Sequence, residues 1–242
     1  MKTIRVDACG LQCPGPILKM KKTMDSLVSG DRVEITSTDP GFPRDAAAWC
    51  NSTGNQLISK EAAGGKSVVV IEKGEPKSCN IVTSCEGKGK TFIMFSDDLD
   101  KALATFVLAN GAAATGQKVT IFFTFWGLNV IKKLHKPNVE KDIFGKMFGM
   151  MLPSSSRKLK LSKMSMGGIG GKMMRYIMNR KGIDSLESLR QQALENGVEF
   201  IACQMSMDVM GVKQEELLDE VTIGGVATYM ERADNANINL FI

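Results

Sequence analysis

The feature that most constrains the fold is an interruption of the hydrophobic periodicity at residues 74–90. This stretch is rich in Gly, Ser and Lys and separates two regions with regular hydrophobic patterns. Such a composition is typical of a linker. The 242 residues are too many for one small domain and suffice for two. Hydrophobic residues make up 43% and charged residues 24%, which excludes wholesale disorder. We therefore expect a first domain at 1–73, a linker at 74–90 and a second domain at 91–242.

The first region mixes two hydrophobic periodicities. Val33 and Ile35 alternate with polar residues, as in a half-buried strand, whereas Ile17, Met20 and Met24 recur at helical spacing. We expect strands at 4–8, 32–38, 56–62 and 67–73, and helices at 17–28 and 42–52. This β-α-β-α-β-β order indicates a two-layer α/β sandwich with helices on one face of a sheet.

The second region has continuous apolar strands that alternate with helices. We expect strands at 91–96, 118–125, 198–203 and 238–242, and helices at 99–110, 184–196 and 225–232. The helix at 184–196 has Asp184 as its predicted N-cap, with Glu187 three residues later. Continuous apolar strands are typical of a mainly parallel sheet that is covered on both faces.

An insertion at about 132–181 interrupts this pattern. It contains 13 basic and 2 acidic residues, whereas residues 182–242 contain 3 basic and 11 acidic residues. Half of the sixteen methionines lie between Met147 and Met178. A segment of this length and composition is expected to be a partner surface or a mobile lid. Pairing of its positive charges with the acidic segment of the same chain is an equally good interpretation.

The sequence favours a cytoplasmic protein. No run reaches the roughly 18 apolar residues of a membrane span, and Arg5 and Asp7 interrupt what would be the apolar core of a signal peptide. The formal net charge of +5 is too small to require a nucleic-acid partner, and we expect none. The cytoplasm keeps thiols reduced, so a disulfide framework is not expected.

The chain has six cysteines and one histidine, His135. A Cys-His catalytic pair or a Cys2His2 zinc site is therefore nearly excluded, and the cysteine spacings do not fit a four-thiolate zinc site. We expect no metal and no cofactor. The remaining roles are buried apolar residue and reactive thiol. The cysteines are Cys9, Cys13, Cys50, Cys79, Cys85 and Cys203.

Cys13 precedes the sequence Pro14-Gly15-Pro16 at the expected start of the first helix. Proline suits the first turn of a helix, which places Cys13 at or just before the N-cap. Unpaired backbone N–H groups and the helix dipole there favour a thiolate. This geometry alone leaves a reactive thiol and a structural cysteine equally open.

The segment from Val6 to Pro16, VDACGLQCPGP, resembles the signature of the TusA/SirA family of small sulfur carriers. The resemblance covers nearly all of residues 1–73 and extends to further short motifs in this region. It implies that Cys13 carries sulfur as a persulfide and that Cys9 is incidental, with a Cys9–Cys13 disulfide or resolution of the persulfide by Cys9 as the alternative. The further positions are Gly30-Asp31, Thr38-Asp39-Pro40, Asp45, Trp49-Cys50 and Gly54-Asn55.

Cys203 follows the apolar strand 198–202, at a strand end where reactive groups of parallel α/β sheets usually lie. Position alone favours an inert buried cysteine. Residues 90–242 resemble the DsrE/DsrF-like family, through Cys203-Gln204-Met205-Ser206-Met207-Asp208, Gly224-Gly225-Val226-Ala227 and the Met/Gly-rich insertion. That resemblance implies a flavodoxin-like three-layer fold without a flavin, an oligomer, and a persulfide on Cys203.

Together the two resemblances imply a sulfur relay protein, a persulfide carrier rather than an ordinary turnover enzyme. Its partners would be sulfur donor and acceptor proteins of the cysteine desulfurase, rhodanese or disulfide-reductase type. Cys79 and Cys85 either carry sulfur between the two main cysteines or have no role in the relay.

Two alternative functions stay open. One is a module whose basic insertion binds a membrane, a protein or RNA, and some long DsrE-like proteins do associate with membranes. The other is a dithiol redox enzyme that uses Cys79 and Cys85.

Overall fold

The computed structural model describes residues 1–11, 15–75, 89–114, 116–135, 137, 139–141 and 143–242. The chain divides into two compact units, Met1–Glu86 with Ile223–Asn235, and Gly87–Thr222 with Ala236–Ile242. Most of the expected linker, residues 76–88, lies outside the described residues. The boundaries 1–73, 74–90 and 91–242 therefore remain a prediction.

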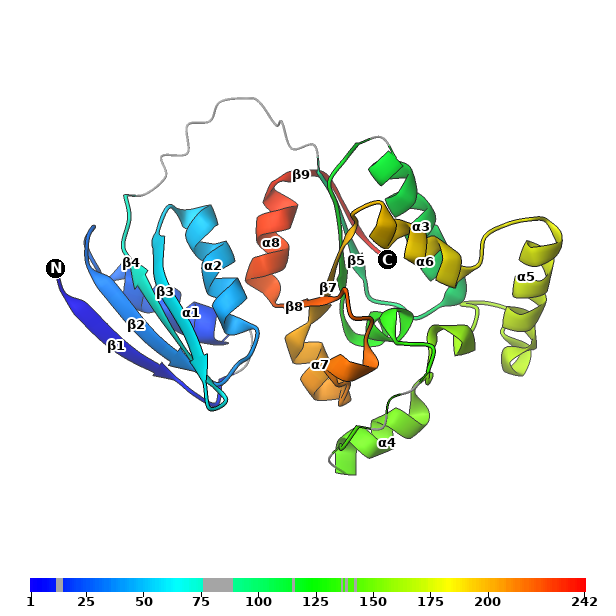
Figure 1. Ribbon diagram of the computed structural model, residues 1–242, viewed down its shortest axis with the longest axis horizontal. Coiled ribbons are helices and arrows are strands. Elements are labelled where there is room, and N and C mark those ends of the chain that lie inside the picture. The colour runs from blue at the N-terminus through cyan, green and yellow to red at the C-terminus, as the bar shows by residue number, and fades with distance from the viewer. Residues whose placement is uncertain (12–14, 76–88, 115, 136, 138, 142) are drawn as a thin grey trace. The chain divides into compact units, whose positions relative to one another are not determined.

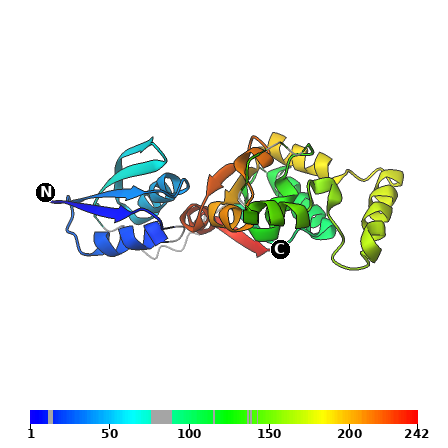
Figure 2. The ribbon, with the colours of Figure 1, turned by 90° about the horizontal axis from the view of Figure 1, so that it is seen from below.

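The first unit is a four-stranded sheet with two helices on one face (Figures 1 and 2). The strand order is β1-β2-β4-β3, with β1 parallel to β2 and the other pairs antiparallel. The predicted β-α-β-α-β-β sandwich is confirmed. Its elements are β1 (Thr3–Ala8), α1 (Gly15–Asp25), β2 (Arg32–Ser37), α2 (Phe42–Thr53), β3 (Gln56–Ala63) and β4 (Lys66–Glu72).

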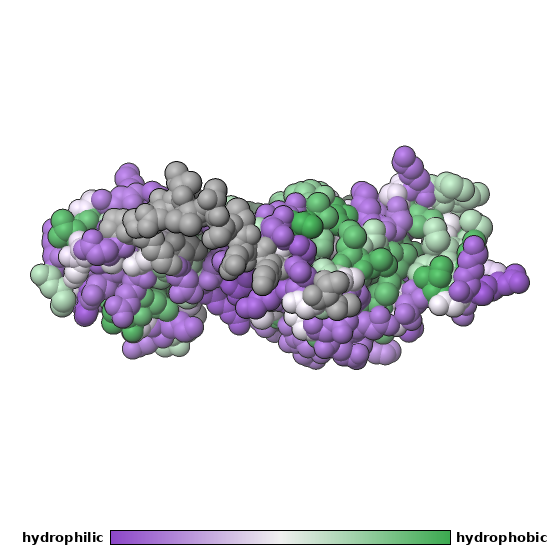
Figure 3. Space-filling view, turned by 90° about the horizontal axis from the view of Figure 1, so that it is seen from above, coloured by the Kyte–Doolittle hydropathy of each residue, from purple (hydrophilic) through white to green (hydrophobic). Residues whose placement is uncertain are grey.

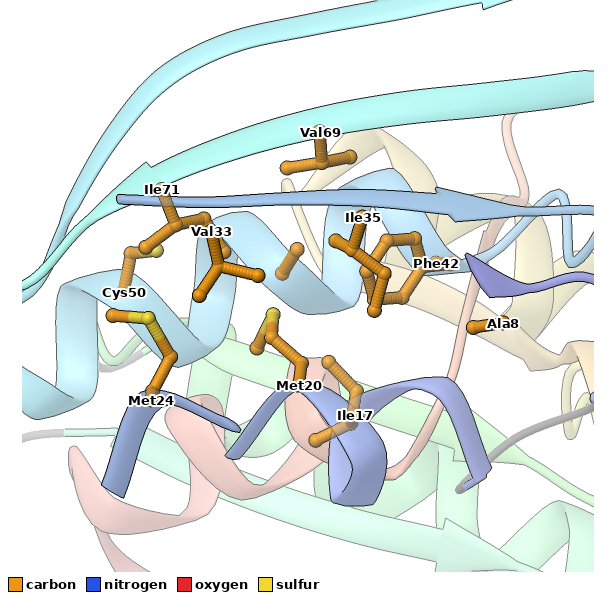
Figure 4. Packing of buried hydrophobic residues seen from close by; sticks show 11 residues of the cluster. Ala8, Ile17, Met20, Met24, Val33, Ile35, Phe42, Cys50, Val69 and Ile71 are labelled. Carbon is orange, nitrogen blue, oxygen red and sulfur yellow. The ribbon is translucent and has the colours of Figure 1, made fainter. Parts of the chain in front are cut away.

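The core of this unit follows from the two periodicities in the sequence. Alternate residues of β2 point into the core, so Val33 and Ile35 are fully buried. Helical spacing in α1 places Met20 and Met24 on the face that covers them (Figure 4). Burial of each such side chain contributes roughly 1.5–3 kcal/mol.

The first unit also contains α8 (Val226–Asp234), which packs on α2. Asp45 of α2 is buried, and its Oδ1 accepts hydrogen bonds from the backbone N–H of Gly225 (2.9 Å) and Thr228 (3.3 Å) and from the Thr228 hydroxyl. These are unpaired N–H groups of a helix start, so Asp45 acts as the N-terminal cap of α8.

The second unit is built on a five-stranded sheet flanked by helices (Figure 1). Its strand order is β8-β7-β6-β5-β9, and β9, β5, β6 and β7 run parallel to one another. All five residues of β6 are buried, as expected for a central parallel strand. The predicted α/β fold with a mainly parallel sheet is confirmed. Its elements include β5 (Gly89–Met94), α3 (Leu99–Ala114), β6 (Val119–Phe123), α6 (Leu186–Glu195), β7 (Glu199–Cys203), α7 (Gln204–Met210), η4 (Gln214–Glu216), β8 (Thr222–Gly224) and β9 (Ala236–Phe241).

Two expected boundaries in this unit were wrong. The predicted strand at 118–125 ends at Phe123, because Phe125 has a φ of 46° and begins a 3-10 helix, η1 (Phe125–Ile131). The N-cap of α6 is Ser185, whose Oγ accepts a hydrogen bond from the Ser188 N–H (3.2 Å), and not Asp184. Asp184 instead accepts a hydrogen bond from the Ser188 hydroxyl (3.1 Å).

The basic insertion contains short helices rather than a single long one: α4 (Ile143–Met151), η2 (Ser156–Lys158), η3 (Met166–Gly168) and α5 (Ile169–Arg180). Part of its charge pairs with the acidic segment of the same chain, in the ion pairs Lys133–Asp219 (2.7 Å), Lys141–Glu216 (2.5 Å) and Arg175–Glu187 (3.2 Å). Several methionines remain exposed, and hydrophobic and hydrophilic surfaces are interleaved in this unit (Figure 3).

Candidate functional site

The structure places only some of the predicted site residues. Cys13, Cys79 and Cys85 lie outside the described residues. On either side of Cys13 the chain is defined: a turn bonds Leu11 N–H to Ala8 O (3.3 Å) after β1, and α1 begins at Gly15. The predicted position of Cys13 at the start of the first helix lies outside the described residues and stays a prediction.

Cys9 lies in this turn and is half-buried. Its backbone N–H donates to Asp7 Oδ1 (2.9 Å), and this bond and the thiol hold the pKa of Asp7 below its ordinary value. The hydrogen bond to the Asp7 carboxylate in turn raises the pKa of the Cys9 thiol. A protonated thiol is a poor nucleophile, so these contacts agree with the interpretation of Cys9 as incidental.

The Lys19 side chain adds positive charge to the same turn. Its Nζ donates a 2.6 Å hydrogen bond to the backbone O of Asp7, which reaches back from α1 to the end of β1. The direction of a lysine side chain on this helix does not follow from the sequence. In the structure, the Lys19 side chain points toward the end of β1.

Cys50 is a core residue. It is 2% exposed and lies beside Met24 and Ile71 (Figure 4). Burial raises the pKa of its thiol to about 12. A thiol in this environment is inert, as the sequence interpretation of an apolar helix residue predicts.

Cys203 is the last residue of β7 and the N-cap residue of α7. The predicted position at the end of a strand and the beginning of a helix is confirmed. The residue is 6% exposed, so the thiol lies against the interior of the unit rather than in open solvent. Parallel strands end at the same edge of the sheet, so segments that follow β5 and β6 also lie at this edge.

The segment after β6 is fixed by a close backbone contact. A Cβ atom at Gly127 would lie 1.9 Å from the backbone O of Met94, so only glycine fits at this position. Its N–H donates to Phe95 O (2.8 Å). The Phe125 ring, held at positive φ, lies 5.5 Å from the Phe95 ring. These contacts anchor η1, which packs against α7.

Polar side chains of η1 and α7 lie at this edge. The hydroxyls of Thr124 and Ser206 are 2.8 Å apart and both residues are buried. Asn129 Nδ2 donates to Asp97 Oδ2 (2.9 Å), and burial raises the pKa of Asp97. Gln204 Nε2 donates to Asp208 Oδ1 (3.0 Å).

Two amide oxygens in this group have no hydrogen-bond partner among the described residues, Asn129 Oδ1 and Gln204 Oε1. Both residues are buried, at 0% and 7% exposed. The sequence interpretation missed both. Gln204 was signalled only by its place next to Cys203, and Asn129 by nothing, because it lies within the apolar run FWGLNVI.

The described parts of the chain show no group of three His, Cys, Asp or Glu side chains arranged to hold a metal ion. They also contain no helix long and apolar enough to cross a membrane. What the described residues offer is a thiol at a helix start, at the edge of the sheet where polar side chains of η1 and α7 also lie.

Comparisons with known proteins cover both units. Residues 87–241 match the DsrE/DsrF/DrsH-like family, and residues 4–73 match the sulfurtransferase TusA family. An uncharacterized protein of Bacillus subtilis, YrkE, is 44% identical over 155 residues, which are 64% of this chain and 97% of that protein. The sulfur carrier protein DsrE2 of Allochromatium vinosum is 38% identical over 161 residues, 65% of this chain and 99% of that one. The sulfur carrier protein TusA of the same organism is 43% identical over 68 residues, 28% of this chain and 90% of that one.

Proposed function

Because the chain belongs to the DsrE/DsrF/DrsH-like family over residues 87–241 and to the TusA family over residues 4–73, we propose that it is a sulfur relay protein that carries sulfane sulfur as persulfides on Cys13 and Cys203. The observation that carries the proposal is the position of Cys203, where β7 ends and α7 begins. The assignment of Cys13 is supported by the match of residues 4–73 to the TusA family.

The chemistry needs only thiols. A thiolate attacks the outer sulfur of a donor persulfide, a new S–S bond forms, and the bond in the donor breaks to release the donor thiolate. The outer sulfur keeps its proton, so no oxidant or reductant is consumed. The partners are accordingly proteins that present a persulfide or a thiolate, of the cysteine desulfurase, rhodanese or disulfide-reductase type, in a compartment that keeps thiols reduced.

Peptide mass spectrometry after exposure of the full chain to a persulfide donor tests the proposal. We expect adducts of about 32 Da, the mass of one sulfur atom, on the peptides that contain Cys13 and Cys203. Cys13→Ser and Cys203→Ser should each remove the adduct at that site alone, and Cys50→Ser, at a buried thiol, is the matched control. Absence of adducts from both sites would overturn the proposal.

The same experiment separates the relay from a dithiol enzyme. If Cys79 and Cys85 cycled through a disulfide, replacing either would abolish activity while Cys13→Ser would be tolerated. In the relay, Cys13→Ser removes an essential station, and neither Cys79 nor Cys85 is required for loading of Cys203.

We propose a second role for the basic insertion, as a surface that binds anionic lipid. Ile143 and Met150 of α4 are 83% and 85% exposed, and Lys146 lies on the same helix. Exposed apolar side chains next to a lysine suit the boundary of an anionic bilayer. In the double variant Ile143→Glu/Met150→Glu, binding to phosphatidylserine vesicles, measured by cosedimentation, should weaken at least fivefold. Unchanged binding would exclude the role.

A further inference from the structure

Two buried amides at the Cys203 edge of the sheet share an unusual hydrogen-bond pattern. In each, the NH2 group donates to a carboxylate, Asn129 to Asp97 (2.9 Å) and Gln204 to Asp208 (3.0 Å). In each, the oxygen is buried without a partner among the described residues. A buried acceptor without a donor costs about as much as a lost hydrogen bond, so such a group calls for an explanation.

The orientation of the Gln204 amide is determined by its partner. Oxygen and nitrogen of a glutamine side chain are assigned from the hydrogen bonds around them. A carboxylate such as Asp208 accepts hydrogen bonds, so it binds the NH2 group and turns Oε1 the other way. Gln204 directly follows Cys203 and is the first residue of α7. The two elements in contact, η1 and α7, thus each carry a buried oxygen acceptor that has no donor among the described residues, and the one on α7 belongs to the residue next to Cys203.

Acceptors of this kind distinguish between the two forms of a persulfide. An anionic persulfide has no hydrogen to donate and is a nucleophile, whereas a neutral persulfide donates its S–H. The neutral form is also the better electrophile, because an attacking thiolate is not repelled by a charge on the outer sulfur. An environment of oxygen acceptors stabilises the neutral form.

We propose that Gln204 is a positioning residue whose Oε1 accepts the S–H of a persulfide on Cys203, and thereby makes Cys203 the station that gives sulfur away. The inference rests on the proposed function, since it requires that Cys203 carries sulfur. An acceptor thiolate attacks the outer sulfur, the S–S bond to Cys203 breaks, and Cys203 leaves as a thiolate. The outer sulfur keeps its hydrogen and forms the persulfide of the acceptor, so atoms and electrons balance.

The test compares two reactions of the same loaded thiol. The full chain carrying Cys13→Ser is loaded with inorganic polysulfide, and the Cys203 peptide is followed by mass spectrometry. Sulfur transfer to glutathione reports the persulfide as electrophile, and alkylation by iodoacetamide reports it as nucleophile. We expect Gln204→Met to slow transfer about tenfold and to speed alkylation severalfold. A change in access to the thiol would move both rates in the same direction.

Asp208 supplies a matched pair of variants at an exposed position, where folding is not at risk. Asp208→Asn retains an oxygen that accepts from Gln204 Nε2, so both rates should stay within about twofold of the parent. Asp208→Ala removes that acceptor and frees the amide to turn its NH2 group toward the persulfide, so it should behave like Gln204→Met. If transfer and alkylation both became faster or both became slower in Gln204→Met and Asp208→Ala, this inference would be overturned and the proposed function would stand. A Cys203 that takes up no sulfur would overturn the proposed function as well.

Discussion

The two junctions at which a strand leads into a helix, β1 to α1 and β7 to α7, differ in how the chain surrounds them. The first junction has an exposed turn in which a charged carboxylate, Asp7, binds the thiol and the N–H of Cys9. The second has a buried thiol, Cys203, followed by Gln204, whose NH2 group donates to Asp208 and whose oxygen has no donor among the described residues. These two thiols, Cys9 in the turn after β1 and Cys203 at the end of β7, therefore differ in burial and in the charge of the side chain next to them.

The largest effect is expected from a substitution at Gly127 in η1, the element that packs against α7 of the second junction. Gly127→Ala introduces a Cβ atom 1.9 Å from the backbone O of Met94, so η1 must move. We expect the free energy of unfolding of this unit to fall by about 3 kcal/mol, measured by urea denaturation, with faster alkylation of Cys203.

Gly111→Ala is the matched control for Gly127→Ala. It lies within α3, and its Cβ would meet nothing within 4 Å. It should raise the free energy of unfolding by about 0.5–1 kcal/mol, because alanine favours a helix over glycine. Equal effects of the two substitutions would show that the close approach at Gly127 does not hold η1.

A smaller effect is expected on the pH dependence of stability, through the buried thiol of Cys50. It tests whether burial by itself keeps a thiol protonated and therefore inert. Its folded-state pKa is about 12 against an ordinary value of 9.0, so between these values the native chain keeps a proton that the unfolded chain has lost. The stabilisation is complete below about pH 9 and is lost as the pH rises toward 12, with a slope of up to about 1.4 kcal/mol per pH unit.

Denaturation curves from pH 8 to 11 measure this slope. Lysines and tyrosines titrate over the same range, so the quantity of interest is the difference between the wild-type chain and Cys50→Ala. We expect the stability of the wild-type chain to fall more steeply. Parallel curves would mean that the Cys50 thiol ionises as readily in the folded chain as in the unfolded one.

The smallest effect concerns the exposed junction. Asp7→Asn removes the carboxylate that raises the pKa of the Cys9 thiol, so more thiolate is present at pH 8. Alkylation of Cys9 should become about threefold faster. Asp25→Asn, at a carboxylate paired with Lys21 (2.6 Å) in α1, should leave the Cys9 rate unchanged. If Asp7→Asn left the alkylation rate of Cys9 unchanged, the Asp7 carboxylate would not control this thiol. The electrostatic difference between the two junctions would then be refuted.

Much of the fold could be predicted from periodicity. The alternation of Val33 and Ile35 and the helical spacing of Met20 and Met24 predicted the two layers of the first unit, because each pattern permits only one face to be buried. The predicted strand that continued to Phe125 was too long. Nothing local in an apolar run shows that the backbone turns to positive φ beyond Phe123.

The site was only partly predictable. The position of Cys203 at the end of an apolar strand could be predicted from local signals, whereas its role was implied only by the family resemblance, because position alone favours an inert buried cysteine. Asn129 could not, because its importance arises from a neighbour 32 positions earlier in the sequence, Asp97, which binds its NH2 group.

By itself the sequence determined two α/β units and the position of Cys203 where a strand gives way to a helix, since hydrophobic spacing and helix-start residues act over a few neighbouring positions. The tertiary structure alone decided that Cys203 is buried and that the oxygens of Asn129 and Gln204 find no donor in the part of the chain that the structure describes. Burial and hydrogen-bond pairing depend on which segments meet across the sheet edge, and distant segments meet only once the chain has folded.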